Sequence, residues 1–379
     1  MANNHIHIHK SLLPVSWLYG IVVSVRNRLF DLGILKSRRF DLPVISIGNL
    51  AVGGTGKTPH VEYLIRLLKE DYGIAVLSRG YKRRTHGFVI ATLTSTASDI
   101  GDEPMQVKSK FPSVTVAVDE DRCDGIEKLT SGQNARQVEV VLLDDAFQHR
   151  YVKPGLSILL IEYDRLEGDK MLPAGRLREP MSGIQRADVV VVTKCPETLT
   201  TDDMEAAGAS LHLRSSQKLF FSTTEYQELE PLFCGDNLSL NSLSAESHVL
   251  LLTGIANPTP LLREIQRRTR QVTHLSFGDH HTFSSSDISA INTAYAALPP
   301  SAIVITTEKD AMRLSQQSGL SQEVRHHAYQ LPIKVRFLHE AETFDQIIKD
   351  YVREAPEGRL PAQRADGRAD EGKIHRTEE

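Results

Sequence analysis

Residues 43–70 read PVISIGNLAVGGTGKTPHVEYLIRLLKE, and this stretch decides the fold. Its first part, 43–50, is a short apolar run typical of a buried strand. A glycine-rich turn follows at 51–59, and the remainder carries apolar side chains at helical spacing. A strand, a glycine-rich turn and a helix in this order, with Gly-Lys-Thr closing the turn, match the tail of the phosphate-binding loop G-x-x-x-x-G-K-[ST].

The residue types of this loop suit a bound triphosphate. Glycines let backbone N–H groups turn toward phosphate oxygens, and the helix N-terminus adds partial positive charge. Lys57 would reach the β- and γ-phosphates, and the Thr58 hydroxyl would ligate Mg²⁺. A glycine turn that merely joins strand to helix is the alternative, because Ala51 replaces the first glycine of the motif. The nucleotide-binding residues that we predict are Ala51, Val52, Gly53, Gly54, Thr55, Gly56, Lys57 and Thr58.

A second buried strand, predicted at 138–145 (VEVVLLDD), ends in two carboxylates. Asp144 and Asp145 would lie at the carboxyl end of a parallel strand, where α/β sheets place their ligands. A carboxylate there holds Mg²⁺ directly or through water. A helix cap or turn is the alternative for a lone Asp, but two in a row after a phosphate-binding loop favour a metal site. Gln148 and His149 follow beside the same site.

A third acidic element lies in the loop ASDIGDEPMQ at 97–106, which holds Asp102 and Glu103. A kinase needs a group that accepts a proton from its acceptor alcohol, and Asp102 is a candidate for that base. A structural role in the loop is the alternative, since Asp after Gly is common in turns.

Three arginines are candidates for holding an anionic substrate. Arg79 begins the basic stretch RGYKRRTHG, and Arg176 and Arg178 lie in the Pro- and Gly-bounded loop LPAGRLREP at 172–180. A solvated surface and an ordinary turn are the respective alternatives.

Strand-like runs alternate with helical or loop segments from residue 44 to residue 193. This alternation predicts an α/β fold with a P-loop NTPase-like, mostly parallel, doubly wound sheet. A shift to Ser, Glu and Asn after residue 220, followed by new strand and helix patterns, predicts a second, smaller α/β domain. We expect an N-terminal amphipathic helix in 1–40, the P-loop core in 41–220, the smaller domain in 221–354 and a disordered tail in 355–379.

The N-terminal segment differs in charge from the rest of the chain. Residues 1–40 carry six basic residues and one acid, a local charge of +5 in a chain whose net charge is −4. Its apolar side chains from Leu18 to Leu32 form one helical stripe, but the longest stretch without a charged residue, 11–25, is shorter than the roughly 20 residues that span a bilayer. Two interpretations stay open: a helix packed on its own domain, or an in-plane membrane helix with aromatic anchors and a basic face.

Composition excludes several classes. Of the 379 residues, 40% are hydrophobic and 24% charged, which is ordinary globular usage and unlike a disordered, collagen-like or multi-span membrane chain. A slightly acidic net charge argues against a nucleic-acid partner. Cys123, Cys195 and Cys234 show neither zinc-ligand spacing nor a disulfide framework, which favours a reducing compartment.

Taken together, the motifs resemble one family, the tetraacyldisaccharide 4′-kinases of lipid A biosynthesis. Ala146 and Lys82 stand where that family usually has glycine. The matching segments, in order, are GNLAVGGTGKTP (48–59), LSRGY (77–81), GDEP (101–104), LDDAFQHR (143–150), LPAGRLRE (172–179), FGDHH (277–281) and TEKD (307–310).

The resemblance implies a kinase that moves the γ-phosphate of ATP to the 4′-hydroxyl of a tetraacyldisaccharide 1-phosphate, using Mg²⁺. It implies that Asp102 is the base, with His280 from the second domain as its partner, and that Lys57 binds phosphate. It also implies work at the cytoplasmic face of the inner membrane, as a peripheral protein on anionic lipid, without an obligate protein partner. The metal ligands that it implies are Thr58, Glu103, Asp144 and Asp145, and the acceptor-binding candidates are Arg79, Gln148, His149, Arg176 and Arg178.

Two other functions share some of these features. A P-loop ATPase or GTPase acting as a membrane-bound switch or metallochaperone would have the same loop and strand-end acids, and VVVTKCP (190–196) is similar to a base-reading motif. A nucleotide-gated scaffold would bind nucleotide without turnover.

Overall fold

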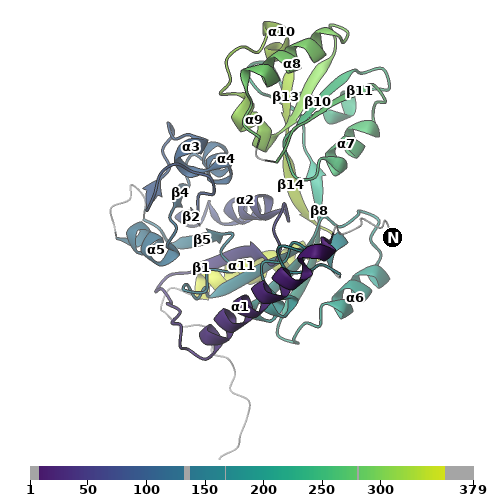
Figure 1. Cartoon of the computed structure of the whole chain (residues 1–379). Helices are drawn as coiled ribbons and strands as arrows, with labels where there is room; N and C mark the ends of the chain where they lie inside the picture. Colours follow the sequence, from purple (N-terminus) through teal and green to yellow (C-terminus); the bar gives the residue numbers. More distant parts are fainter. Residues whose placement is uncertain (1–7, 132–136, 167, 280, 355–379) are drawn as a thin grey trace, which may run out of the picture.

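The computed structural model describes residues 8–131, 137–166, 168–279 and 281–354. His280 and the tail 355–379, for which the sequence predicts a catalytic role and disorder, lie outside these ranges. The described chain forms two α/β units, each built on its own sheet, with the N-terminal helix across the larger one (Figure 1).

The larger sheet is mostly parallel and has β1 near its middle. In the part of the chain that is described, nine strands lie in the order β14-β8-β7-β6-β1-β5-β2-β4-β3, and only β3 and β14 pair antiparallel to their neighbours. The strands are β1 (Val44–Asn49), β2 (Ile74–Ser78), β3 (Val89–Ile90), β4 (Thr115–Val118), β5 (Val140–Asp144), β6 (Leu156–Glu162), β7 (Val189–Thr193), β8 (Lys218–Tyr226) and β14 (Ile333–Phe337).

Helices cover both faces of this sheet, which explains why its central strands are apolar throughout. Along β5, Val140 and Leu142 pack in the core beneath α2, α4 and α11, whereas Val141 and Leu143 pack against α5. Further along the second face, α6 covers β6 and β7. The helices are α2 (Lys57–Leu68), α4 (Asp102–Lys110), α5 (Arg122–Thr130), α6 (Thr201–Ser210) and α11 (Ala341–Glu354), and the short α3 (Ala97–Ile100) precedes α4.

The smaller unit has a five-stranded sheet in the order β11-β10-β12-β13-β9. Its core is separate from that of the larger unit. Its elements are β9 (Glu230–Pro231), β10 (Val249–Thr253), α7 (Thr259–Gln266), β11 (Val272–Ser276), α8 (Ser285–Ala296), β12 (Ile303–Thr307), α9 (Glu308–Leu314), α10 (Gln322–His326) and β13 (Ala328–Leu331). The two sheets and the N-terminal helix confirm the predicted fold class.

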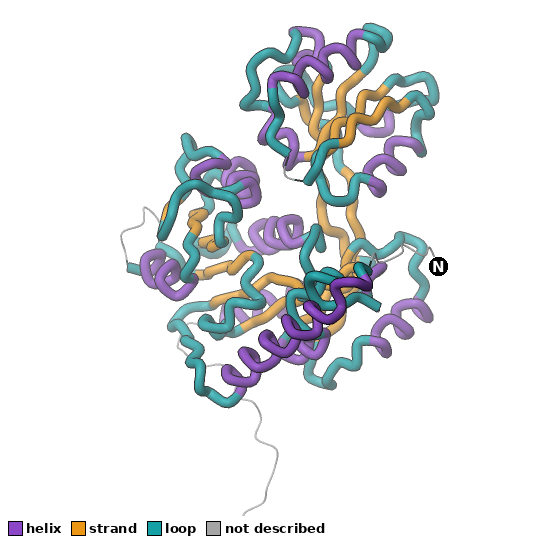
Figure 2. Tube along the Cα trace, in the orientation of Figure 1, coloured by secondary structure: helices purple, strands orange, loops and turns teal. Residues whose placement is uncertain are grey.

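The division of the chain differs from the predicted boundaries of 221–354. Strand β8 belongs to the larger sheet, and the chain returns to that sheet through β14 and α11 after completing the smaller unit. These two strands run side by side between the units (Figure 2). The reason is packing: Phe344, Ile348 and Val352 of α11 bury in the core beneath β1, so residues 333–354 complete the larger unit.

The N-terminal helix α1 (Leu13–Asp31) presents its polar side to the protein and its apolar side outward. Ser16 Oγ donates to the Met171 carbonyl at 2.7 Å, and Tyr19 Oη donates to the Arg178 carbonyl at 3.0 Å. By contrast, Trp17 is 73% exposed, and much of the predicted apolar stripe, such as Val22, faces solvent as well. No helix within the described ranges is long and apolar enough to cross a bilayer.

Candidate active site

The glycine-rich loop is fixed at Thr55 by two hydrogen bonds. Asn49 Nδ2 donates to Thr55 Oγ1 at 2.9 Å, and the Thr193 hydroxyl donates to the Thr55 carbonyl at 2.9 Å. At the start of α2, Gly56 has φ of 88°, a left-handed conformation that glycine adopts without strain. The loop is therefore held open in a shape that turns backbone N–H groups toward a ligand.

A second segment pairs with this loop along its edge. The backbone N–H of Val52 donates to the Arg176 carbonyl at 2.8 Å, and that of Arg178 donates to the Leu50 carbonyl at 2.7 Å. The Arg176 guanidinium lies against Gly53, 3.5 Å from where a Cβ would stand. The two predicted segments, 51–58 and 172–180, thus form one structure.

The acidic pair lies opposite Lys57. The buried Lys57 Nζ is 3.7 Å from Asp145 Oδ1, and Arg178 Nη1 donates to both carboxylate oxygens of Asp145 at 3.0 Å. Gly48 of β1 makes this approach possible, because a Cβ there would lie 2.7 Å from the Cβ of Phe147. Any larger side chain at that position would push the loop after β5 away from the phosphate-binding loop.

Asp144 ends β5 and is buried. Its pKa rises to about 7 because of burial first and then because of the nearby charges of Glu103 and Asp145; Lys57 and Lys309 oppose the rise. Asp144 Oδ1 is buried without a hydrogen-bond partner among the described residues. Three carboxylates thus lie close together, with Lys57 and Lys309 as the cations that act on Asp144.

The first turn of α4 meets α9 of the smaller unit. Arg313 Nη2 donates to Asp102 Oδ2 at 2.6 Å, and Lys309 Nζ donates to Glu103 Oε1 at 2.6 Å. Burial lowers the pKa of Lys309, but Glu103, through charge and hydrogen bond, outweighs it and leaves the pKa raised. A further ion pair joins Lys110 to Glu308. These contacts bring the predicted base and its neighbour to the boundary between the units.

One cleft of about 1800 Å³ connects these groups. It is lined by the phosphate-binding loop, by Asp102, Glu103 and Asp145, and by both units of the molecule. The predicted acceptor-binding residues also line it: Arg79, Gln148, His149, Arg176 and Arg178. Because Arg178 already donates to Asp145, its first role in this arrangement is to position that carboxylate.

Comparison with known proteins gives a family for this arrangement. The family model described as tetraacyldisaccharide-1-P 4′-kinase matches residues 8–353. The chain belongs to this family of kinases. It is 53% identical over 365 residues to the tetraacyldisaccharide 4′-kinase of Bacteroides thetaiotaomicron, covering 93% of this chain and 96% of the relative. The same enzyme of Phocaeicola vulgatus is 50% identical over 357 residues, covering 93% and 98% of the two chains.

A solved structure of the same kinase family has this fold. The crystal structure of LpxK from Aquifex aeolicus in complex with ATP superimposes with a TM-score of 0.69 at 31% identity. The alignment covers 90% of this chain and 98% of that chain. The chain is therefore a phosphotransferase of this kinase family, as its motifs predicted.

Two residues depart from the family's usual glycines. Lys82 has φ of 61°, in the left-handed region, which costs a side chain about 1–2 kcal/mol relative to glycine. Ala146 is buried in the core beneath α5 and has no such φ, so its methyl group packs without backbone strain.

Two residues that hold this kinase site together, Glu179 and Arg313, were not among the predicted site residues. Glu179 is 1% exposed and accepts hydrogen bonds from Gln148, Arg186 and Asn27. Arg313 was not singled out either, although it contacts Asp102. The family motif LPAGRLRE contains Glu179, and that was a usable signal; Arg313 lies outside the motif TEKD and offered none.

Proposed function

We propose that this cleft carries out the family's reaction, transfer of the γ-phosphate of ATP to the 4′-hydroxyl of tetraacyldisaccharide 1-phosphate to form lipid IVA in lipid A biosynthesis. The observation that carries the proposal is the convergence of a phosphate-binding loop, Asp102, Glu103 and Asp145 on one cleft between two units, with the buried Asp144 beside them. A kinase needs both a triphosphate cradle and a proton acceptor, and a simple nucleotide switch needs only the first.

The donor set fits Mg²⁺. Thr58 offers a hydroxyl, and Glu103, Asp144 and Asp145 offer carboxylate oxygens, which are the hard ligands that Mg²⁺ prefers. The buried Oδ1 of Asp144, which has no hydrogen-bond partner among the described residues, offers a ligand position for such a cation. When bound, the ion neutralises charge that develops on the transferred phosphoryl group.

Lys57 and the loop backbone do the remaining work on the phosphates. The Lys57 ammonium lies at the helix N-terminus and adds positive charge where the β- and γ-phosphate oxygens would sit. Arg176, beside Gly53, supplies a second cation to the same loop. These groups bind and orient the triphosphate before any bond changes.

Asp102 accepts the proton of the acceptor hydroxyl in this proposal, since an alcohol is a poor nucleophile at neutral pH. His280, outside the described residues, is the proposed partner that orients the carboxylate. Because Asp102 and Arg313 come from different units, the proton acceptor is complete only when the units are together. That arrangement limits wasteful hydrolysis of ATP.

The acceptor lies toward α1. Tyr19, Arg26 and Asn27 of this helix line the cleft, whereas the outward face, with Trp17 and Val22, is apolar. We infer that the outward face lies in the lipid surface of the inner membrane while the disaccharide head group reaches Arg79, Gln148 and His149. In this proposal, the inner face of α1 packs on its own domain and the outer face lies in the membrane surface.

The direct test supplies ATP, Mg²⁺ and tetraacyldisaccharide 1-phosphate, and measures phosphate on the lipid. Acceptor-dependent transfer is expected. Hydrolysis that is equally fast without the acceptor would instead identify a switch ATPase, and binding without turnover would identify a scaffold.

Membrane docking is tested with Val22→Asp combined with Val25→Asp, two exposed positions of α1. Binding to vesicles that contain anionic lipid should fall at least about tenfold, because each valine contributes roughly 1.5 kcal/mol or more when buried. Leu93→Asp, an exposed site 77% accessible and outside α1, is the control and should leave binding unchanged. Equal vesicle binding by all three proteins would refute the docking.

A further inference from the structure

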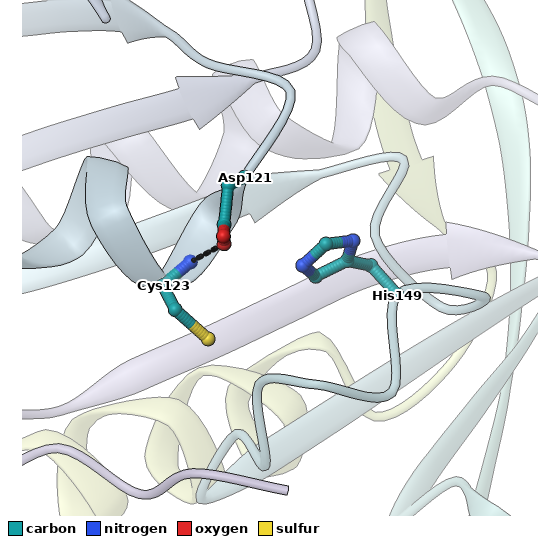
Figure 3. A group of neighbouring side chains, drawn as sticks. All are labelled: Asp121, Cys123 and His149. Atoms are coloured by element: carbon teal, nitrogen blue, oxygen red, sulfur yellow. Dashed lines mark hydrogen bonds between the residues drawn. The ribbon is translucent and has the colours of Figure 1, made fainter. Parts of the chain in front are cut away.

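A second cluster of metal-type ligands lies apart from the phosphate-binding loop. Asp121 precedes α5, Cys123 lies in its first turn, and His149 follows β5, so the cluster joins two elements (Figure 3). One ligand atom from each of the three lies within 4.8 Å of the others. These residues do not have the spacing of zinc ligands in the sequence, because only the fold brings His149 to Cys123.

The imidazole is positioned as a ligand. Its ring points toward Asp121 and Cys123 (Figure 3), and its Nε2 atom is buried without a hydrogen-bond partner in the described part of the chain. A buried ring nitrogen that is left without a partner costs free energy, and a bound cation would remove that cost.

Asp121 and Cys123 can each offer an atom to a metal ion. Asp121 Oδ1 accepts the Cys123 backbone N–H at 2.8 Å, which caps α5 and leaves the second carboxylate oxygen available. Cys123 is a half-buried free thiol. Arg122 is the cation nearest in sequence. Of the five acids between positions 119 and 127, Glu120, Asp124 and Glu127 already form ion pairs with basic side chains, so Asp121 is the carboxylate placed to serve the cluster.

We propose that Cys123 Sγ, a ring nitrogen of His149 and a carboxylate oxygen of Asp121 bind a zinc-class divalent cation, with water completing a tetrahedral site. Thiolate and imidazole are ligands that Zn²⁺ accepts and Mg²⁺ does not, so this site differs in chemistry from the carboxylate site at Asp144. On binding, the Cys123 thiol gives its proton to water and the sulfur enters as thiolate.

Binding would tie the start of α5 to the loop after β5. That loop carries Asp145 and Gln148, which line the cleft. An ion here would therefore stiffen one wall of the cleft without contacting the nucleotide loop. The inference does not depend on the proposed reaction, since it concerns metal binding alone.

The first experiment uses the intact, unsubstituted chain. Metal-free protein is treated with a thiol alkylating reagent with and without Zn²⁺, and the modification of each cysteine is followed by mass spectrometry. Zn²⁺ should slow the alkylation of Cys123 at least about tenfold, because a coordinated sulfur is a poor nucleophile. Cys234, exposed in the structure, is the internal control and should react at the same rate. Equal rates at Cys123 with and without Zn²⁺ would overturn the proposal.

The second experiment measures Zn²⁺ affinity by competition with a chromophoric chelator. Cys123→Ser should weaken binding at least about tenfold, and Cys234→Ser should not change it. Asp121→Asn removes the charge but keeps a good helix cap, so it should weaken binding without unfolding α5. Retained affinity in both Cys123→Ser and Asp121→Asn would rule the site out.

The alternating histidines at the N-terminus need a control of their own. His5, His7 and His9 are replaced by Ala in a parallel set, since histidines spaced two apart in the sequence can also bind Zn²⁺. The tight site should remain in that background. If it disappears there, the ion was bound by the terminus and the Asp121–Cys123–His149 site is refuted.

Discussion

The two sides of the cleft are built in opposite ways. On the nucleotide side, the loop after β1 is held within the larger unit, by Asn49 at the end of β1 and by Arg176 and Thr193 from distant segments of that unit. On the other side, Asp102 and Glu103 meet Arg313 and Lys309, which are 211 and 206 residues away. Backbone hydrogen bonds dominate the first side, and charged side-chain pairs between the two units dominate the second.

This contrast indicates a division of labour. The groups that hold the phosphate-binding loop all belong to the larger unit. We therefore expect nucleotide binding to depend on the larger unit only. A proton acceptor held from the other unit depends on how the two units meet. Substitutions on the nucleotide side should therefore change nucleotide affinity, and substitutions on the other side should change turnover.

The largest effect is expected at Asp102. Asp102→Asn removes the proton acceptor and should lower kcat by roughly 10²–10⁴-fold, the usual contribution of a general base. Nucleotide affinity should stay within about twofold, because the cradle is intact. Phosphate transfer and equilibrium ATP binding are measured on the same protein. Asp350→Asn on α11, which does not line the cleft, is the control, and near-normal turnover in Asp102→Asn would remove this residue from the mechanism.

Next in size is the cradle itself. Lys57→Met removes the buried ammonium near the terminal phosphates and should lower kcat/KM by roughly 10²–10³-fold, as for other preorganised charge partners. Unlike Asp102→Asn, it should also weaken ATP binding. Lys69→Met, at the C-terminal end of the same helix, is the matched control. If Lys57→Met spared ATP affinity, the proposed contrast between the two sides would fail.

A smaller effect is expected at the junction. Arg313 holds Asp102 and also donates to Asp310 at 3.2 Å, so its planar fork has two anchors. Arg313→Lys keeps the charge but loses one of these two hydrogen-bonded contacts. A charged hydrogen bond contributes about 1.5 kcal/mol, so kcat should fall about tenfold, while KM for ATP should not change. Arg336→Lys, in an exposed pair with Glu197, should have no effect. A rise in KM for ATP in Arg313→Lys would show that the junction also shapes the cradle.

The smallest effect concerns His60, which joins the phosphate-binding loop to strand β8 of the same unit. Its Nδ1–H donates to the Gly56 carbonyl at 2.8 Å, and its Nε2 accepts from Ser222 at 3.2 Å. Burial lowers its pKa from 6.5 to about 4, although the hydrogen bond to Gly56 opposes this. The unfolded chain therefore takes up a proton first as pH falls, and the stabilisation, complete above about pH 6.5, is lost progressively toward about pH 4.

Chemical unfolding at about pH 7.5 and about pH 5.5 checks this effect. The wild-type protein should lose roughly 1 kcal/mol more than His60→Gln over that interval. His149 has a similarly lowered pKa, but it is present in both proteins and cancels in the difference. An equal loss in the two proteins would mean that His60 stays accessible to protons in the folded state.

The sequence predicted the backbone elements of the nucleotide side because their signals are local. The strand, turn and helix of 43–70 and the acids after β5 follow from periodicity and from what strand ends do in α/β sheets. Strands β8 and β14 were not recognised, since 222–247 reads as polar connection and 333–337 as part of the smaller unit. The boundary of the smaller unit was misplaced for the same reason.

What the sequence determined by itself was every feature fixed by near neighbours: the loop, the Asp pair, the apolar stripe of α1 and the doubly wound pattern. The tertiary structure alone decided which side of α1 faces outward, that Arg313 reaches Asp102, and that Cys123 and His149 meet. The physical reason is that local patterns fix backbone shape and periodicity. Contacts between distant residues depend on how whole elements pack, and no short window of sequence contains that information.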